Sequence, residues 1–258
     1  MSEFFNIKTN SNVSTIELNR DPVNALSFNF LLDLKNAFIE LDNDSDIRVI
    51  IVKTNLDHFS AGADLKERKI MSKNESGDAL DNFNDCFNTI ESCSKPVICC
   101  IDGFCLGGGA ELALSCDIRI GTIKSTIGFP EVSIGIIPGA GGTQRLPKIL
   151  GIANAKYWIY SAKKFNGKDA LDYGFLNFIE DDYESVLLTA QNICDEIIKN
   201  APIAVSAAKK AIKDGFNESL DKALTIERHS YNIALNTEDR DEALSAFIDK
   251  RKPIWRNK

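Results

Sequence analysis

The sequence predicts an α/β fold, and two observations carry that prediction. Short apolar segments rich in β-branched residues alternate with longer amphipathic segments through the first half of the 258-residue chain. Strands and helices that alternate in this way form a mostly parallel sheet with right-handed crossovers. After about residue 185 the strand pattern stops and only helical segments follow. We therefore expect an α/β body with a helical C-terminal region.

The first elements follow from two different spacings. Residues 13–18 read VSTIEL, in which apolar and polar side chains alternate as in a half-buried strand. Residues 28–42 place leucine and phenylalanine every three or four positions, which puts these side chains on one face of a helix. The run IRVIIVK at 47–53 is nearly all apolar, as in a strand that is covered on both faces.

The next elements repeat this order. A helix is expected near 78–92, and Pro96 then opens the apolar strand PVICCI. The segment GGGAELALSC begins another helix, and DIRIGT at 117–122 returns as a strand. This repetition indicates helices that cross from one strand to the next.

Four helices are expected at the C-terminal end of the chain. They are predicted over residues 185–199, 202–214, 218–235 and 238–250. Pro202 suits the first turn of a helix, and Gly215 suits a helix end. We assign residues 1–197 to the core and residues 198–258 to the helical region.

Composition narrows the classes of function. The formal net charge of −7 argues against a broad nucleic-acid surface, although it leaves room for a local phosphate pocket. Seven scattered cysteines form no CxxC pair and no cluster at metal-ligand spacing, so we expect reduced thiols and no metal site. The N-terminus has no signal segment, and no apolar run reaches the roughly 20 residues of a membrane span. We expect a cytoplasmic protein without a membrane partner.

Two glutamates are the strongest candidates for chemistry. Glu111 follows three glycines in GGGAEL, and Glu131 follows Pro130 in a loop. Two carboxylates in one apolar pocket cannot both ionise easily, so one pKa rises and the pair supplies an acid and a base. Each residue also has an ordinary explanation, because Glu111 could complement a helix N-terminus and Glu131 could be a solvated loop residue.

Two turns offer backbone N–H groups for an oxyanion. The glycines at 107–109 stand where a strand meets a helix, and the first N–H groups of a helix have no intrahelical partner. The turn SAGAD at 60–64 offers a second N–H, although Asp64 is also a good helix cap. GAGGT at 139–143 lacks the GK[ST] ending of a phosphate loop, so we expect a tight turn into a helix there.

Taken together, these segments resemble the crotonase, or enoyl-CoA hydratase/isomerase, superfamily. The resemblance covers residues 12–253 and rests on the strings AGADLKER, IDGFCLGGGAELALSCDIRI, GFPEVSIGIIPGAGGTQRLPKILG and EALSAFIDKRK. It implies a crotonase-like core, a spiral of ββα turns, with a helical C-terminal region that serves oligomerisation. It also implies assembly as a homotrimer or as a homohexamer made of two trimers.

The resemblance implies roles for the candidate residues. The N–H groups of Ala63 and Gly108 would form the oxyanion hole, and Glu111 and Glu131 would be the catalytic pair. Because the hydratases of the superfamily use both glutamates, the implied reaction is reversible syn addition of water to a trans-2-enoyl-CoA, which gives a 3-hydroxyacyl-CoA. Glu131 would supply the proton at C2, and Glu111 would hold or activate the water. No separate cofactor is implied, since CoA is part of the substrate.

The resemblance also implies positions that contact CoA. Near the SAGAD turn they are Ala61, Asp64, Leu65 and Lys66, of which Lys66 could reach a phosphate. Near the C-terminus they are Tyr231, Phe247 and Lys250, which approach the CoA nucleotide in part from a neighbouring subunit. Many relatives have a basic residue where Asp21 stands, which puts that phosphate contact in doubt here.

Within the superfamily, the strings look closest to methylglutaconyl-CoA hydratases of leucine breakdown. The distal carboxylate of that substrate would need a basic partner, and Arg68 or Lys69 is the hypothesis. One member of that subfamily also binds AU-rich RNA through a lysine-rich helix, whereas residues 29–47 here carry one lysine among five acidic residues. The alternatives are therefore another crotonase reaction, such as double-bond isomerisation, and more distantly RNA binding.

Overall fold

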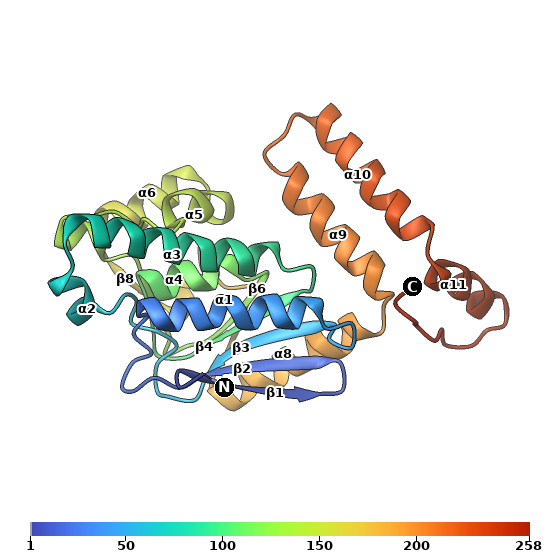
Figure 1. Cartoon of the computed structure of the whole chain (residues 1–258), viewed down its shortest axis with the longest axis horizontal. Coiled ribbons are helices and arrows are strands. Elements are labelled where there is room, and N and C mark those ends of the chain that lie inside the picture. The colour runs from blue at the N-terminus through green and yellow to red at the C-terminus, as the bar shows by residue number, and fades with distance from the viewer. Residues whose placement is uncertain (1) are drawn as a thin grey trace.

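The computed structural model describes residues 2–258 (Figure 1), and its centre is a six-stranded sheet with the order β1-β2-β3-β4-β6-β9. In that order the strands span Phe5–Asn10, Val13–Leu18, Val49–Thr54, Val97–Ile101, Ile118–Thr122 and Phe178–Glu180. β1 is antiparallel to β2, and each later pair is parallel. The alternating strands and helices thus form the mainly parallel sheet that the sequence predicted.

A second sheet consists of three short strands in the order β5-β7-β8. They span Phe104–Leu106, Thr126–Gly128 and Lys164–Asn166. β5 leads into helix α4 (Gly108–Ser115), and β7 leads into the 3₁₀ helix η1 (Glu131–Ile134). β5 and β7 pair in parallel, and the Gly107 N–H donates to the Gly128 carbonyl at 2.9 Å. The starts of α4 and η1 therefore lie side by side.

Helices cover both faces of the large sheet. α1 and α3 lie side by side over one face (Figure 1), whereas α8 covers the other. These helices span Phe28–Asn43, Lys73–Ser92 and Tyr183–Ile198. α1 begins after Ser27, whose hydroxyl accepts from the Phe30 N–H, and it buries its leucine- and phenylalanine-rich face. Because both faces are covered, β3 can be apolar almost throughout.

Four shorter helices complete the body, and three helices project from it at the C-terminal end (Figure 1). The shorter helices α2, α5, α6 and α7 span Leu65–Ile70, Gly142–Leu150, Ile152–Ser161 and Gly167–Asp172. The projecting helices α9, α10 and α11 span Pro202–Gly215, Leu220–Leu235 and Glu238–Ile248. α9 packs along α10. Within residues 2–258, none of the helices is long and apolar enough to cross a membrane.

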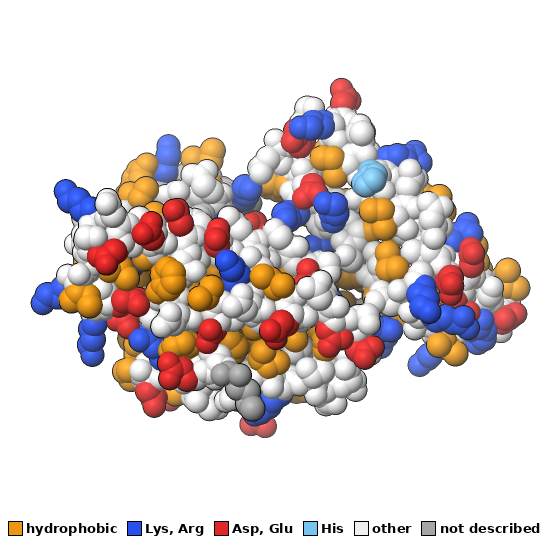
Figure 2. All heavy atoms as spheres, viewed as in Figure 1, with side chains coloured by type: hydrophobic (Ala, Val, Ile, Leu, Met, Phe, Trp, Pro, Cys, Tyr) orange, Lys and Arg blue, Asp and Glu red, His pale blue; other side chains and the backbone are white. Residues whose placement is uncertain are grey.

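Large apolar side chains stay exposed on the projecting helices and the turn between them. They include Ile212, Phe216, Leu220, Phe247 and Ile248. Figure 2 shows apolar side chains on this part of the surface, interspersed with charged ones. The body of the chain leaves these side chains uncovered. α8 ends at Ile198, next to the predicted boundary at 197/198, and the division into two units stays a prediction.

Several predicted helices have different ends from those expected: the helix predicted over 185–199 is α8 at Tyr183–Ile198, and the one predicted over 218–235 is α10 at Leu220–Leu235. The helix expected near 78–92 begins at Lys73, because Ser72 and Glu75 form a capping box that starts it earlier. The last helix ends two residues early, at Ile248, since the backbone turns left-handed shortly afterwards.

The sequence did not indicate five of the strands. In β1 every side chain but that of Phe5 is exposed, and most of the exposed side chains are polar. Its sequence therefore shows no clear alternation of apolar and polar residues. β5, β7, β8 and β9 have three residues each, which is too short for a period to appear. The seven cysteines are all buried and form no disulfide among residues 2–258, and their reduced state stays a prediction.

Candidate active site

A cavity of about 900 Å³ brings the principal candidate residues together. Ala63, Gly108, Glu111 and Glu131 all line it. The rest of its wall comes mainly from α3 and from the loop between η1 and α5, and much of it is apolar. Examples of these apolar wall residues are Leu80, Phe83, Ile134, Ile136, Ile137 and Pro138. Polar groups are few here, which is typical of a substrate cavity with a small reactive centre.

Two backbone N–H groups lie close together at this centre. Gly62 has φ +96°, and a Cβ built on it would lie 3.2 Å from the Gly108 nitrogen. A Cβ built on Gly108 would lie 3.5 Å from the Ala63 nitrogen. The two turns therefore pack backbone against backbone, which glycine permits. No hydrogen bond among residues 2–258 takes up the N–H of Ala63 or of Gly108.

Glu111 is held firmly on α4. Its side chain is buried, and Oε1 accepts hydrogen bonds from the N–H groups of Ala140 and Gly142, each at 2.8 Å. Arg145 fixes this loop, because it donates to the Ala140 carbonyl and pairs with Glu91 at 2.8 Å. A side chain on Gly142 would lie 2.9 Å from Oε1, so only glycine leaves room for the carboxylate.

Burial raises the pKa of Glu111 to about 7. The Gly142 N–H opposes this shift, whereas the neighbouring charge of Glu131 adds to it. The carboxyl therefore titrates near neutral pH.

Glu131 has a freer carboxyl group. It is the first residue of η1 and is buried, and burial raises its pKa to about 6. Its Oε2 is buried without a hydrogen-bond partner among the described residues. A Cβ on Gly107 would lie 3.0 Å from Oε1, which places this carboxyl beside the start of α4.

The geometry defines what the centre can do chemically. Two carboxyls with raised pKa values can give and take protons near neutral pH. Two free N–H groups beside them can stabilise an oxygen that gains negative charge during a reaction. This combination suits proton transfer next to a carbonyl group.

The predicted CoA positions near the SAGAD turn have mixed surroundings. Leu65 lines the cavity, whereas Ala61 does not, and Lys66 is exposed. Asp64 caps α2 as expected and also pairs with Arg20 at 2.7 Å. Burial raises the pKa of Asp64, but the Arg20 guanidinium and the helix N–H groups outweigh it and hold the pKa below its usual value. Its carboxylate is thus occupied within the chain.

The predicted C-terminal positions do not meet the cavity within one chain. Tyr231 lies on α10 and Phe247 on α11, while Lys250 follows α11 with φ 54°. None of the three lines the cavity, and α10 and α11 lie at the opposite end of the molecule from α2 (Figure 1). Their predicted contact with CoA would therefore need a neighbouring subunit.

The residues that position the glutamates carry no signal in the sequence. They are Ala140 and Gly142, whose N–H groups bind Glu111, together with Arg145 and the cavity residue Phe83. Arg145 is buried and pairs with Glu91, as buried arginines usually do with a carboxylate. Nothing in the spacing of TQRLPKIL marks it, so the signal is absent from the sequence.

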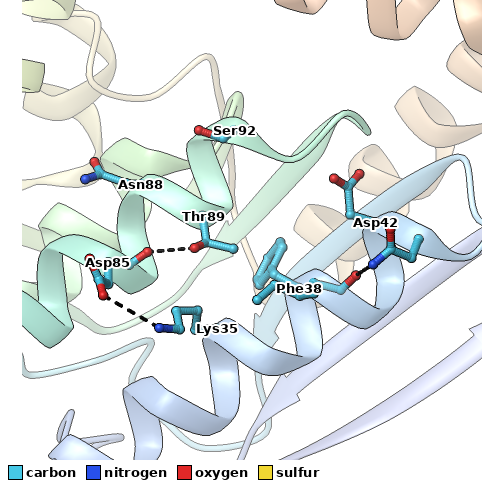
Figure 3. Close-up of a pocket in the computed structure, with 9 residues that line it drawn as sticks. Lys35, Phe38, Asp42, Asp85, Asn88, Thr89 and Ser92 are labelled. Atoms are coloured by element: carbon cyan, nitrogen blue, oxygen red, sulfur yellow. Dashed lines mark hydrogen bonds and ion pairs between the residues drawn. The ribbon is translucent and has the colours of Figure 1, made fainter.

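A second hollow, of about 530 Å³, lies between α1 and α3 (Figure 3). Lys35 points from α1 toward Asp85 on α3, and the two groups are 3.6 Å apart. Thr89 donates to the Asp85 carbonyl at 2.7 Å. Neither glutamate nor either free N–H lines this hollow. Among residues 2–258, the one cation that lines this hollow is Lys35, which is already paired, so the hollow carries no comparable chemistry.

Known proteins resemble this chain in both sequence and fold. The family described as Enoyl-CoA hydratase/isomerase matches residues 8–258. The short-chain-enoyl-CoA hydratase of Clostridium acetobutylicum is 39% identical over 242 residues, which are 93% of this chain and 92% of that protein. The mitochondrial methylglutaconyl-CoA hydratase of Mus musculus is 38% identical over 237 residues, covering 90% of this chain and 76% of that protein.

A solved structure completes the comparison. The crystal structure of an enoyl-CoA hydratase from Bacillus anthracis matches with a TM-score of 0.96 at 36% identity, and it covers 99% of this chain and 100% of that one. This match confirms the predicted crotonase fold. The family match over residues 8–258, together with these relatives, shows that the chain belongs to the enoyl-CoA hydratase/isomerase family.

Proposed function

We propose that this protein is an enoyl-CoA hydratase that adds water reversibly to a trans-2-enoyl-CoA and forms a 3-hydroxyacyl-CoA. Enzymes of this family act on acyl-CoA thioesters. The observation that carries the proposal is the presence of Glu111 and Glu131 in one cavity with the free N–H groups of Ala63 and Gly108. Hydration needs an acid, a base and an oxyanion site, and this cavity can supply all three.

In the proposed mechanism, the thioester oxygen accepts from the Ala63 and Gly108 N–H groups. Water bound at Glu111 forms the new bond between its oxygen and C3, and its proton passes to the ionised Glu111 carboxylate. Protonated Glu131 donates its proton to C2, so the C2–C3 double bond becomes single. Glu131 loses one proton and Glu111 gains one, so the net charge of the two carboxyls does not change. The two N–H groups stabilise the negative charge on the oxygen between these steps.

The surroundings of the glutamates support this division of roles. Glu111 Oε1 accepts two N–H bonds, which hold the carboxylate in one position and so support its proposed role in binding the water. Glu131 Oε2 has no partner among residues 2–258, so a proton on it would be available to the substrate. The raised pKa values belong to an interacting pair of carboxyls. They determine the pH range in which one carboxyl is protonated and the other ionised, but they do not assign the roles of acid and base.

For the acyl group, we propose 3-methylglutaconyl-CoA as the favoured substrate, as in leucine breakdown. Support comes from the methylglutaconyl-CoA hydratase relative at 38% identity. The short-chain relative at 39% identity is as similar, so names alone do not decide between the two.

The test is hydration of crotonyl-CoA, decenoyl-CoA and 3-methylglutaconyl-CoA, followed by loss of enoyl-thioester absorbance. We expect hydration with a preference for 3-methylglutaconyl-CoA, and we expect Glu131→Gln to lower the rate of hydration by about 10²- to 10⁴-fold. Hydration that favours crotonyl-CoA would keep the reaction and change the substrate. If none of the three is hydrated, the proposed reaction is wrong, and substrates for double-bond isomerisation come next.

We further propose that the chain assembles as a homotrimer or a homohexamer through its C-terminal helices. The exposed Phe216, Leu220 and Phe247 support this, because large apolar side chains seldom stay in water together. Light scattering after size-exclusion chromatography should give three or six times the chain mass. A monomer would contradict the proposal. The cytoplasmic location stays a prediction, which fractionation of the source cells would test.

A further inference from the structure

Arg68 is the only lysine or arginine among the described residues that line the 900 Å³ cavity. It lies on α2, beside an apolar wall that includes Leu80 and Phe83. Burial lowers the pKa of its guanidinium, since the charged form loses contact with water. A cation in such surroundings gains more from an anionic partner than an exposed one does.

The chain itself gives Arg68 no such partner. Its guanidinium donates one hydrogen bond, to the Ser76 carbonyl at 3.1 Å, and lies 5.2 Å from the centre of the Phe83 ring. The adjacent Glu67 carboxylate instead accepts from the Phe28 N–H at 3.1 Å. Among residues 2–258, Arg68 forms no ion pair, and most of the five N–H donors of an arginine remain free.

Other cations near the two hollows behave differently. Arg20 pairs with Asp64 at 2.7 Å, and Arg145 pairs with Glu91 at 2.8 Å. Lys35, in the hollow of Figure 3, has Asp85 at 3.6 Å. Arg68 thus differs from these cations in two ways: it lines the cavity, and no carboxylate of residues 2–258 pairs with it.

Phe83 relates Arg68 to the reactive centre. A Cβ built on Gly108 would lie 2.9 Å from Phe83 Cε1, and the guanidinium lies against the same ring. Only the Phe83 ring therefore separates the Arg68 guanidinium from Gly108. The distance between them is at most the width of that ring plus the contact distance on each side of it. The five carbons of a glutaryl chain span about 5 Å from C1 to C5. With C1 near Gly108, a carboxylate at C5 comes within reach of the guanidinium.

We propose that Arg68 is a specificity-determining residue that selects acyl groups ending in a carboxylate, at about the length of a five-carbon diacid. The inference rests on the proposed function only in placing the thioester at Ala63 and Gly108. It also separates Arg68 from Lys69 as the candidate partner of a distal carboxylate, because Lys69 is exposed and does not line the cavity.

The test measures binding of two saturated, unreactive ligands, so it does not depend on hydration. One is glutaryl-CoA, and the other is 5-methylhexanoyl-CoA, in which an isopropyl group of similar shape replaces the carboxylate. Calorimetry gives the Kd of both for the wild type, Arg68→Met, Arg68→Lys and Lys69→Met. Lys69→Met removes an equal charge one residue away and controls for general attraction to the CoA phosphates.

In Arg68→Met we expect glutaryl-CoA binding to weaken by about 10- to 100-fold, the size typical of a lost charge-assisted hydrogen bond. Binding of 5-methylhexanoyl-CoA should change less than about threefold, and Arg68→Lys should recover part of the loss. Lys69→Met should leave the ratio of the two Kd values unchanged. Unchanged binding of the neutral ligand also shows that the Arg68→Met variant is folded.

Equal weakening of both ligands in Arg68→Met would overturn the inference, because Arg68 would then only hold α2 against Ser76 and Phe83. A wild type that binds the neutral ligand more tightly would overturn it as well. Hydration of crotonyl-CoA by the wild type tests the proposed reaction separately. A diacid preference that depends on Arg68, without hydration, would keep the ligand class and reject the reaction.

Discussion

The two walls of the cavity that carry carboxyl groups differ in how firmly they hold them. On the α4 wall, Glu111 accepts two backbone N–H bonds from a loop that Arg145 fixes. On the η1 wall, Glu131 Oε2 is buried without a partner among the described residues. Both carboxyls are buried and both have raised pKa values, so burial alone does not distinguish them. In the proposed mechanism, these hydrogen bonds give two residues of the same type different roles, a fixed base at Glu111 and a free acid at Glu131.

The largest effect should come from removing either carboxyl. We expect Glu111→Gln and Glu131→Gln each to lower kcat for hydration by about 10²- to 10⁴-fold, the usual range for a lost general acid or base. In Glu111→Gln the new amide oxygen can still accept from the Ala140 and Gly142 N–H groups, and we expect both variants to fold. Steady-state kinetics with crotonyl-CoA, beside circular dichroism, measure this. If one variant keeps wild-type kcat, the pair does not act together.

The next effect concerns the pH dependence of stability. The folded pKa of Glu111 is about 7, above the ordinary value of 4.5, so the folded state keeps a proton that the unfolded state releases. This contribution is fully present below pH 4.5 and is lost as pH rises toward 7. Glu111→Gln should therefore gain about 3 kcal/mol in free energy of unfolding, relative to the wild type, between those limits.

Urea unfolding at pH 5 and pH 8, at one protein concentration, measures that difference. Glu131→Gln should show the same sign with a smaller size, because its carboxyl has the lower pKa of about 6. If the free energy of unfolding differs between wild type and variant by the same amount at both pH values, the protonation of the buried carboxyl does not affect stability.

A smaller effect on kcat should follow from disturbing the backbone hydrogen bonds that position the Glu111 carboxylate. A Cβ on Gly142 would lie 2.8 Å from Pro138 Cβ and 2.9 Å from Glu111 Oε1, so Gly142→Ala must displace the carboxylate or the loop. We expect kcat to fall about 10- to 100-fold, since small misplacements of a catalytic group are costly. Gly77→Ala on α3 is the control, because a Cβ there meets nothing within 4 Å. Equal activities in the two variants would contradict the proposed role of this hold.

Much of the fold could be read from periodicity, and the rest depends on contacts between distant residues. The strand predicted over 13–18 coincides with β2, because alternation over six residues is a local signal. Three-residue strands such as β5 carry no such signal, and pairing with β7 defines them. Elements with a clear apolar period were therefore predictable, whereas the three-residue strands and the largely exposed β1 were not.

The site shows the same limit. The sequence motifs indicated Glu111, Glu131 and their neighbouring turns as the candidate site, and in the structure these residues line one cavity. No spacing could show that the backbone near Gly141, with φ +97°, directs two N–H groups at Glu111. Nor could it choose between Arg68 and Lys69, because adjacent helical residues point in different directions and only the packed helix shows which faces the cavity.

The most direct test of the division between the two glutamates is exchange of the C2 protons of butanoyl-CoA in D₂O, followed by NMR. This saturated thioester needs proton transfer at C2 but no attacking water. If Glu131 handles the C2 proton, exchange should occur in the wild type and in Glu111→Gln, and none should occur in Glu131→Gln. Exchange that survives in Glu131→Gln and disappears in Glu111→Gln would contradict that role, since the fixed carboxylate would then be the group that handles the C2 proton.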